Sequence, residues 1–151
     1  MTRSEKAMNY FVEGYNCAQS VALAFSDMLP MTDKEIARMA SSFGGGMGRL
    51  REVCGAVSGM LMIVGEVYGY DGPETGEPKA ALYARVQEVA KRFEARSGSI
   101  ICRELLGLTE KRKAPTPEAR TLEYYNNRPC KALVGLAAEV LEEYMQEQEE
   151  K

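Results

Sequence analysis

VCGAVSGMLMIVGEV, residues 53–67, is the stretch of sequence that decides the fold. It is more apolar than any other segment of the chain, and its apolar residues do not alternate with polar ones as they would in a half-buried strand. A helix that is apolar on most of its faces belongs in the interior of a domain. Because the stretch is also too short to span a bilayer, we predict a central buried helix and no membrane insertion.

Helical spacing of apolar residues continues on both sides of this central helix. Capping residues at Thr2, Asn16 and Thr32 predict the starts of the first three helices. The complete pattern predicts helices over about 3–13, 17–29, 33–43, 53–67, 79–95, 100–106 and 130–141. Thr116-Pro117-Glu118 offers a start for a further short helix. We therefore predict an all-α fold: one compact domain, residues 1–151, with about six or seven helices and an acidic tail that frays from about residue 142.

The composition bears on the partners that the protein can have. The 151 residues are 45% hydrophobic and carry a net charge of −3, a balance that does not favour nucleic acid or an anionic membrane as a partner. The one basic run, residues 111–113, is expected to be a solvated loop. Residues 1–11 lack the apolar region of a secretion signal, so we expect a cytoplasmic protein.

The chain has four cysteines, Cys17, Cys54, Cys102 and Cys130, and no histidine. Permanent disulfides are disfavoured in the cytoplasm, which leaves a metal or cluster site, a cycling thiol pair or plain burial as explanations. The lack of histidine excludes imidazole zinc ligands, a histidine-ligated haem and every Cys–His or Ser-His-Asp arrangement. No Cys-x-x-Cys pair occurs, so the familiar zinc-ribbon, thioredoxin and ferredoxin patterns are absent as well.

All four cysteines fall in the first turn of a predicted helix. Unpaired backbone N–H groups and the helix dipole favour negative charge there, so we expect the thiol pKa values to be lowered, which favours the thiolate. Each cysteine also heads an apolar stripe, as Cys54 does with Val57 and Leu61, which predicts that all four point into the same core. The pattern favours a redox or metal site, with small buried cysteines as the plain alternative.

Glycines and arginines accompany the cysteines. Gly55 and Gly59 lie on one face of the central helix, where they allow the close approach of another helix or of an inorganic group. We interpret the glycine-rich run 44–48 as a flexible connection, with an anion-binding nest as the alternative. Arg49 and Arg51, which follow this run, either offset the charge of nearby thiolates or are exposed.

The motif at residues 54–59, Cys-Gly-Ala-Val-Ser-Gly, resembles the Cys-Gly-Ala-x-x-Gly signature of the C_GCAxxG_C_C family. The resemblance extends from residues 14–19 through 43–49 to Cys102 and Cys130, with no cysteine missing. It implies an all-helical protein whose redox role is assigned mainly from its cysteines. A similar domain occurs in a split-Soret type of cytochrome c, where an iron–sulfur cluster accompanies haem. Since this chain has neither histidine nor Cys-x-x-Cys-His, only the cluster function carries over.

The leading hypothesis is an electron-transfer protein with a [2Fe-2S] cluster held by four thiolates. The site residues are Cys17, Cys54, Cys102 and Cys130 as ligands, with Gly55, Gly59 and Arg49 beside them. The alternatives are metal-free thiol–disulfide or peroxide chemistry by the same cysteines, a structural zinc site with four cysteine ligands, and a plain helical domain. The sequence does not decide between an electron carrier and an oxidoreductase, does not name the redox partner, and leaves a homodimer open.

Overall fold

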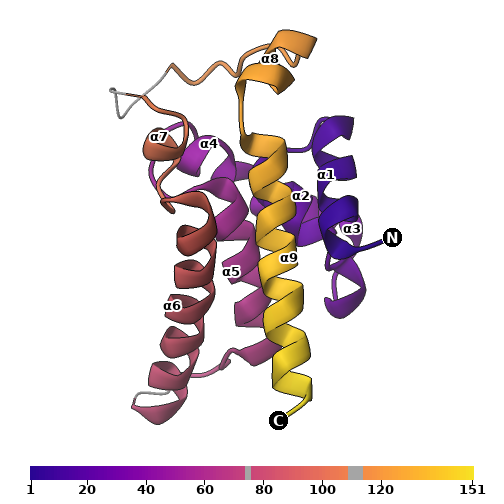
Figure 1. The fold of residues 1–151 in the computed structure, drawn as a ribbon. Helices are drawn as coiled ribbons and strands as arrows, with labels where there is room; N and C mark the ends of the chain where they lie inside the picture. The colour runs from indigo at the N-terminus through magenta and orange to yellow at the C-terminus, as the bar shows by residue number, and fades with distance from the viewer. Residues whose placement is uncertain (74–75, 109–113) are drawn as a thin grey trace.

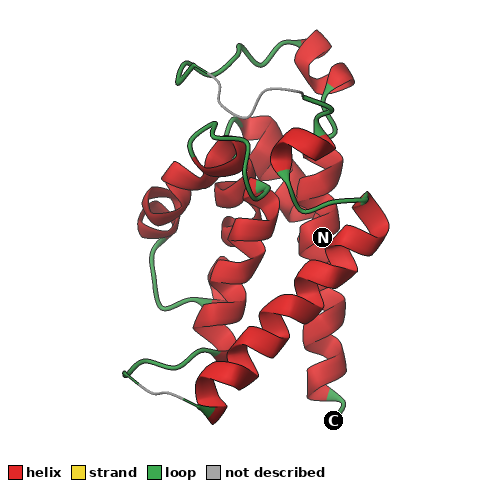
Figure 2. Cartoon of the chain, turned by 90° about the vertical axis from the view of Figure 1, so that its left-hand side faces the viewer, coloured by secondary structure: helices red, strands yellow, loops and turns green. Residues whose placement is uncertain are grey.

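The chain folds into helices joined by loops and turns (Figure 2). A computed structural model describes residues 1–73, 76–108 and 114–151, so the basic run 111–113 lies outside the described residues. The described residues contain no β-strand and one isolated antiparallel bridge, between Val53 and Ile101. The predicted all-α class is confirmed. The elements are α1 (Arg3–Glu13), α2 (Cys17–Leu23), η1 (Ser26–Met28), α3 (Asp33–Ala40), η2 (Ser41–Phe43), α4 (Gly44–Met47), α5 (Gly55–Tyr68), α6 (Glu77–Ser97), α7 (Cys102–Leu105), α8 (Leu122–Asn127) and α9 (Cys130–Glu149).

Helix α5 lies at the centre of the bundle, with α2, α6 and α9 packed against it (Figure 1). Helix α9 runs along α1 and also contacts α2 and α6. The short helices α4, α7 and α8 gather at the end of the bundle where α5 and α9 begin (Figure 1). Cys54 and Cys130, which stand at the N-termini of α5 and α9, therefore both lie at this end.

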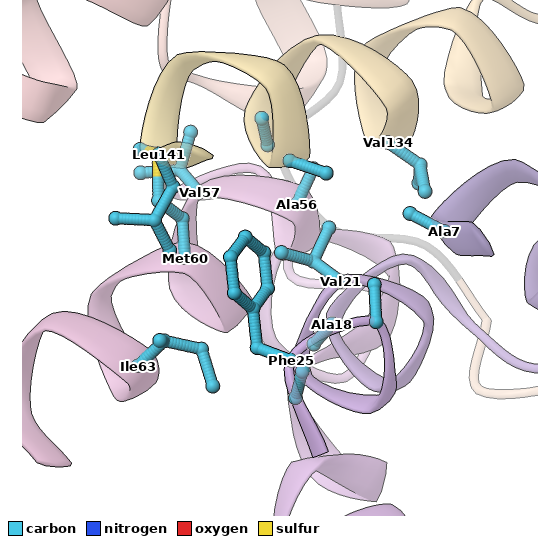
Figure 3. Packing of buried hydrophobic residues seen from close by; sticks show 14 of the residues in the cluster. Ala7, Ala18, Val21, Phe25, Ala56, Val57, Met60, Ile63, Val134 and Leu141 are labelled. Carbon is cyan, nitrogen blue, oxygen red and sulfur yellow. The ribbon is translucent and has the colours of Figure 1, made fainter. Parts of the chain in front are cut away.

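The hydrophobic core fills the space between α1, α2, α5 and α9 (Figure 3). Val21 and Phe25 from the α2 segment meet Val57 and Met60 of α5, and each of these four residues is at most 1% exposed. Burial of an apolar side chain of this size contributes about 1.5–3 kcal/mol. The most apolar stretch of the sequence thus becomes the central helix, as predicted, because it offers apolar side chains to α2, α6 and α9.

Capping residues that are visible in the sequence set the first helix boundaries. Thr2 forms a capping box with Glu5, and Gly14 ends α1 in the left-handed conformation with φ of 117°. Asn16 Oδ1 accepts a hydrogen bond from the backbone N–H of Gln19 at 2.9 Å, and Gln19 Oε1 accepts one from the backbone N–H of Asn16 at 3.0 Å. Such caps satisfy N–H groups that a helix end leaves unpaired, and each contributes about 1 kcal/mol.

Two helices differ in extent from the prediction. Helix α2 ends at Leu23, well before Pro30, because the chain turns at Phe25 to bury its ring and then forms the 3-10 helix η1. Thr116 lies in a connection rather than at a helix start. The next helix, α8, begins after Thr121, whose side-chain oxygen accepts a hydrogen bond from a backbone N–H inside the helix.

Helix α9 continues to Glu149, past residue 142, where we expected fraying to begin. Tyr144 is buried against the core, and Arg92 of α6 forms an ion pair with Glu147 at 2.7 Å, so the last turns of α9 have partners that the sequence pattern does not reveal. Although α6 and α9 are long, none of the helices described here combines the length and the apolar character needed to cross a membrane.

Candidate functional site

A cavity of about 430 Å³ lies at the end of the bundle where α4, α7 and α8 gather. Its lining includes every cysteine of the chain: Cys17, Cys54, Cys102 and Cys130. Cys54 and Cys102 are 5% and 8% exposed, whereas Cys17 and Cys130 are half-buried. The fold therefore places together four side chains that are far apart in the sequence.

Each cysteine stands at the start of a helix. Cys17, Cys102 and Cys130 are the first residues of α2, α7 and α9, and Cys54 is the N-cap residue of α5. The helix starts bring backbone N–H groups toward one cavity, where they favour negative charge. The placement predicted from capping patterns thus agrees with the structure, although it does not by itself establish what the cysteines bind.

Two backbone hydrogen bonds fix Cys54 beside the segment that holds Cys102. The Cys54 N–H donates to the carbonyl oxygen of Ile100 at 2.8 Å, and the Cys102 N–H donates to that of Glu52 at 2.6 Å. They flank the isolated antiparallel bridge described above. A short strand-like pairing, which the sequence analysis did not predict, therefore sets the spacing of these two cysteines.

The glycine-rich run forms an ordered left-handed turn, not the flexible connection that we expected. Every residue of 45–49 has φ between 63° and 72°. The Gly48 N–H donates to the Gly44 carbonyl oxygen at 2.8 Å, and the Glu52 N–H donates to the Gly46 carbonyl oxygen at 2.9 Å, which closes the turn. Glycine adopts this region freely, whereas other residues lose about 1–2 kcal/mol there.

Two glycines leave room for cysteine side chains. A Cβ atom on Gly46 would lie 2.6 Å from Cβ of Cys102, and a Cβ atom on Gly55 would lie 3.0 Å from Cβ of Cys17. Gly59 serves another purpose, because it is not among the described lining residues of the cavity and a Cβ atom there would lie 2.6 Å from the backbone of α2. Gly55 thus belongs to the site, and Gly59 belongs to the packing of α5 on α2.

Positive charge outweighs negative charge around the cavity. Among the described residues, the lining contains four arginines, Arg49, Arg51, Arg120 and Arg128, and one carboxylate, Glu118. Glu118 forms ion pairs with Arg128 at 2.7 Å and with Arg49 at 3.6 Å. Arg120 donates to two backbone carbonyl oxygens near the end of α1, at 2.6 and 2.8 Å.

Arg51 is the buried member of this set and is 3% exposed. Its Nη1 donates a hydrogen bond to Sγ of Cys102 at 3.5 Å. Burial nevertheless raises the pKa of the Cys102 thiol above its ordinary value, although the hydrogen bond and the charge of Arg51 oppose the rise. Arg51 is therefore a counter-charge for sulfur rather than an exposed side chain.

Cys17 and Cys130 line the same cavity, and the ionisation of each thiol depends on the other. The interaction with Cys17 lowers the pKa of Cys130 to about 7, with help from the charges of Arg128, Arg51 and Arg120 and against the effect of burial. The pKa of Cys17 is raised well above its ordinary value, because of its interaction with Cys130 and because the thiol is buried. Cys130 is therefore the thiol of the pair that loses its proton first.

Burial raises the pKa of the Cys54 thiol to about 12, although the backbone N–H groups of Ala56 and Val57 favour its thiolate. The expectation that all four helix starts shift their thiols toward the thiolate is thus wrong for Cys17, Cys54 and Cys102. Removal from water penalises the charged form more strongly than the partial charges of a helix end can stabilise it.

The described His, Cys, Asp and Glu side chains include no group of three or more close enough together to hold one metal ion. A structural zinc ion requires four ligands, with sulfur at about 2.3 Å from the same ion. The thiolate ligands of an iron–sulfur cluster bind different iron ions, so they need not surround one point. The site offers what an iron–sulfur cluster needs, namely thiol ligands, a cavity and surplus positive charge. Binding of one zinc ion would require the cysteines to move closer together.

Sequence reasoning did not single out three further lining residues, Tyr124, Arg120 and Arg128. Arg128 stands two residues before Cys130, and this proximity is the one signal that was available. Arg120 lies just before α8 and Tyr124 lies within it, and their place in the cavity lining depends on tertiary contacts that the sequence pattern does not display.

One family profile, described as "Putative redox-active protein (C_GCAxxG_C_C)", matches residues 15–144. The chain belongs to this family. The match begins before Cys17 and ends within α9, so all four cysteines lie inside it. No curated protein and no solved structure gives a significant match. The resemblance noted at residues 54–59 is confirmed, and this C_GCAxxG_C_C protein belongs to a group described by its redox activity.

Proposed function

We propose that this C_GCAxxG_C_C protein binds an iron–sulfur cluster, [2Fe-2S] in the first instance, through its four cysteines and transfers electrons. The observation that supports the proposal most is the presence of all four cysteines in the lining of one cavity of about 430 Å³. Cysteine thiolates are the usual protein ligands of such clusters, which supply one-electron redox chemistry when bound. The family's description as redox-active agrees with this role.

The charges around the cavity support the same proposal. A cluster ligated by four thiolates carries net negative charge, and its potential depends on that charge and on hydrogen bonds to sulfur. Among the described lining residues, four arginines face one glutamate, and all four cysteines stand at helix starts, where the helix dipole favours negative charge. Because buried charge is unfavourable without a partner, this surplus of positive charge suits an anionic group.

The thiols differ in how readily they become ligands. Cysteine binds metal as the thiolate, so each ligand must first lose its proton. The pKa of Cys130 is lowered to about 7, whereas burial raises those of Cys54 and Cys102, and the interaction with Cys130 together with burial raises that of Cys17. We therefore expect Cys130 to ligate first and the other three to lose their protons as iron binds.

Metal and sulfide analysis of protein purified without oxygen tests the proposal. We expect about two irons and two sulfides per chain, together with thiolate-to-iron absorption bands. Replacing any one of the four cysteines with serine should weaken these bands and lower the iron content. A colourless protein that remains metal-free after reconstitution with iron and sulfide, or one that takes up zinc stoichiometrically instead, would overturn the proposal.

Thiol–disulfide exchange is a second candidate function, and it is favoured by the presence of Cys17 and Cys130 in one cavity lining and by the lowered pKa of Cys130. In this scheme the Cys130 thiolate attacks a disulfide of a partner, which forms a mixed disulfide and releases one partner thiolate. Cys17 then loses its proton and displaces the second partner thiolate. The chain ends with a Cys17–Cys130 disulfide, the partner ends with two thiols, and two electrons have passed to the partner.

Single substitutions distinguish the two functions. Reaction of the metal-free protein with an aromatic disulfide reagent should be lost in Cys130→Ser, whereas Cys17→Ser should stop at the mixed disulfide after releasing one thiolate instead of two. Cys54→Ser and Cys102→Ser are the matched controls, because these residues line the same cavity but take no part in the scheme. Retained exchange in Cys130→Ser would contradict this second function, whereas loss of iron in all four variants would support the cluster.

A further inference from the structure

Arg51 is buried in the wall of the cavity, and backbone hydrogen bonds fix its position. The residue is 3% exposed, and its φ of 61° lies in the left-handed region that favours glycine. Its N–H donates to the Gly45 carbonyl oxygen at 3.2 Å, and its own carbonyl oxygen accepts from the Arg103 N–H at 3.3 Å. Unfavourable backbone conformations persist where the surrounding structure determines them, and they concentrate at functional sites.

The hydrogen bonding of Arg51 is incomplete, unlike that of its neighbour Arg49. Nε of Arg49 donates to the Ala114 carbonyl oxygen at 2.7 Å, and its guanidinium also pairs with Glu118. Nη1 of Arg51 contacts the sulfur of Cys102. Its buried Nε has no hydrogen-bond partner, and the described carboxylates include none that pairs with it.

A buried guanidinium without a counter-charge is unfavourable, since it cannot lose its proton. Glu118 of the same lining also acts on Arg51 through its charge, but its ion pairs are with Arg49 and Arg128. The groups that can supply negative charge in contact with Arg51 are therefore sulfur atoms, because Cys102 touches it and the other cysteines line the same cavity. We propose that Arg51 is a positioning residue that supplies counter-charge and a free N–H donor to the sulfur atoms of this site, and thereby favours its reduced state. This inference rests on the cluster binding proposed above.

The expected direction follows from electrostatics. Each electron that enters makes the site more negative, and a fixed positive charge in a low-dielectric cavity stabilises that state. Hydrogen bonds to sulfur act in the same direction. Arg49 offers a matched control, since it belongs to the same turn, has φ of 66° and lines the same cavity, but its charge is already paired with Glu118.

Redox titration of the cluster-loaded protein tests the role of Arg51. Wild type, Arg51→Met, Arg51→Lys and Arg49→Met are titrated with dithionite, and the visible spectrum is the readout. We expect Arg51→Met to lower the equilibrium constant for one-electron reduction about tenfold, which is a shift of about 59 mV. Arg51→Lys should recover part of this shift, because it keeps the charge but loses the planar fork. Arg49→Met removes a charge that Glu118 already pairs, so it should shift the potential less than Arg51→Met does.

Iron and sulfide analysis, carried out first, separates this inference from the proposed function. A wild-type protein without a cluster would overturn the proposed function and this inference with it. A loaded wild type together with equal potentials in Arg51→Met and Arg49→Met would overturn the role of Arg51 alone. If Arg51→Met keeps its helical circular dichroism but loses the cluster, retention of the cluster by Arg51→Lys would support the need for a counter-charge.

Discussion

Cys17 and Cys130, the first residues of α2 and α9, line one cavity, and each thiol shifts the pKa of the other. The pair is asymmetric, because arginine charges help to lower the pKa of Cys130 while that of Cys17 is raised. This asymmetry assigns Cys130 as the first thiolate of the site, whether it ligates iron or attacks a disulfide. The difference between the two thiols can be measured directly from their rates of alkylation.

Alkylation of the metal-free protein should show Cys130 as the most reactive thiol. We expect its rate of reaction with iodoacetamide, followed by mass spectrometry, to rise with a midpoint near its lowered pKa of about 7. In Cys17→Ala the midpoint should move toward the ordinary cysteine value of about 8.5, because the interaction with Cys17 is lost. Cys54→Ala is the control, and an unchanged midpoint in Cys17→Ala would contradict the pairing.

Stability at alkaline pH should report on Cys54. Its pKa is raised to about 12, so above the unfolded-state value of about 8.5 the folded chain holds a proton that the unfolded chain has lost. Stability therefore falls as pH rises, and Cys54 accounts for about 2 kcal/mol between roughly pH 8 and pH 10. Cys130 acts in the opposite direction, since its lowered pKa stabilises the fold above about 8.5 and this gain is lost as pH falls through about 7.

Urea unfolding of the metal-free wild type and of Cys54→Ala at both pH values measures this contribution. We expect the free energy of unfolding of Cys54→Ala to depend less on pH than that of the wild type. Parallel pH dependences in the two proteins would show that the Cys54 thiol ionises equally in the folded and unfolded states.

Gly46→Ala should destabilise the protein more than Gly48→Ala does. Both glycines have positive φ, so each substitution costs about 1–2 kcal/mol from the backbone. At Gly46 the new Cβ would also lie 2.6 Å from Cβ of Cys102, whereas at Gly48 the nearest atom is 3.7 Å away. We expect overpacking to add about 1–3 kcal/mol at Gly46 alone. Equal losses in chemical denaturation would mean that the turn moves away from Cys102 at little cost.

Asn16→Ala should cost more stability than Thr32→Ala. Both residues cap a helix, which is worth about 1 kcal/mol. The Asn16 side chain in addition donates to the Ser41 carbonyl oxygen at 3.0 Å and thus ties α2 to the turn before α4. We expect a further loss of about 1 kcal/mol in thermal or urea unfolding. A loss no greater than that of Thr32→Ala would show that this tie contributes nothing.

Helix starts were predictable from the sequence because capping is local. Thr2 and Asn16 act on backbone groups within three residues, and the structure shows the hydrogen bonds that the pattern implies. The helix-start positions of the cysteines depend on the same short-range chemistry, and the central helix is marked by its composition. The all-α class and the family resemblance therefore needed no knowledge of tertiary contacts.

The arrangement inside the cavity was not predictable, because it depends on contacts between distant segments. A glycine-rich sequence permits a left-handed backbone at many positions. It does not indicate that five successive residues, 45–49, all adopt this conformation. The burial of Arg51 and the raised thiol pKa values follow from packing that a single sequence does not display. The same holds for the last turns of α9, which are stabilised by partners on α6.

The hydrogen bonds that join residues 52–54 to 100–102, and the contact of α9 with α1, have a consequence for biosynthesis. A chain still on the ribosome, before α9 has been made, lacks Cys130 and the helix that packs along α1. Contacts between such distant segments form late, because the loops that separate them must close first. We therefore expect the four cysteines to come together only after α9 has been translated.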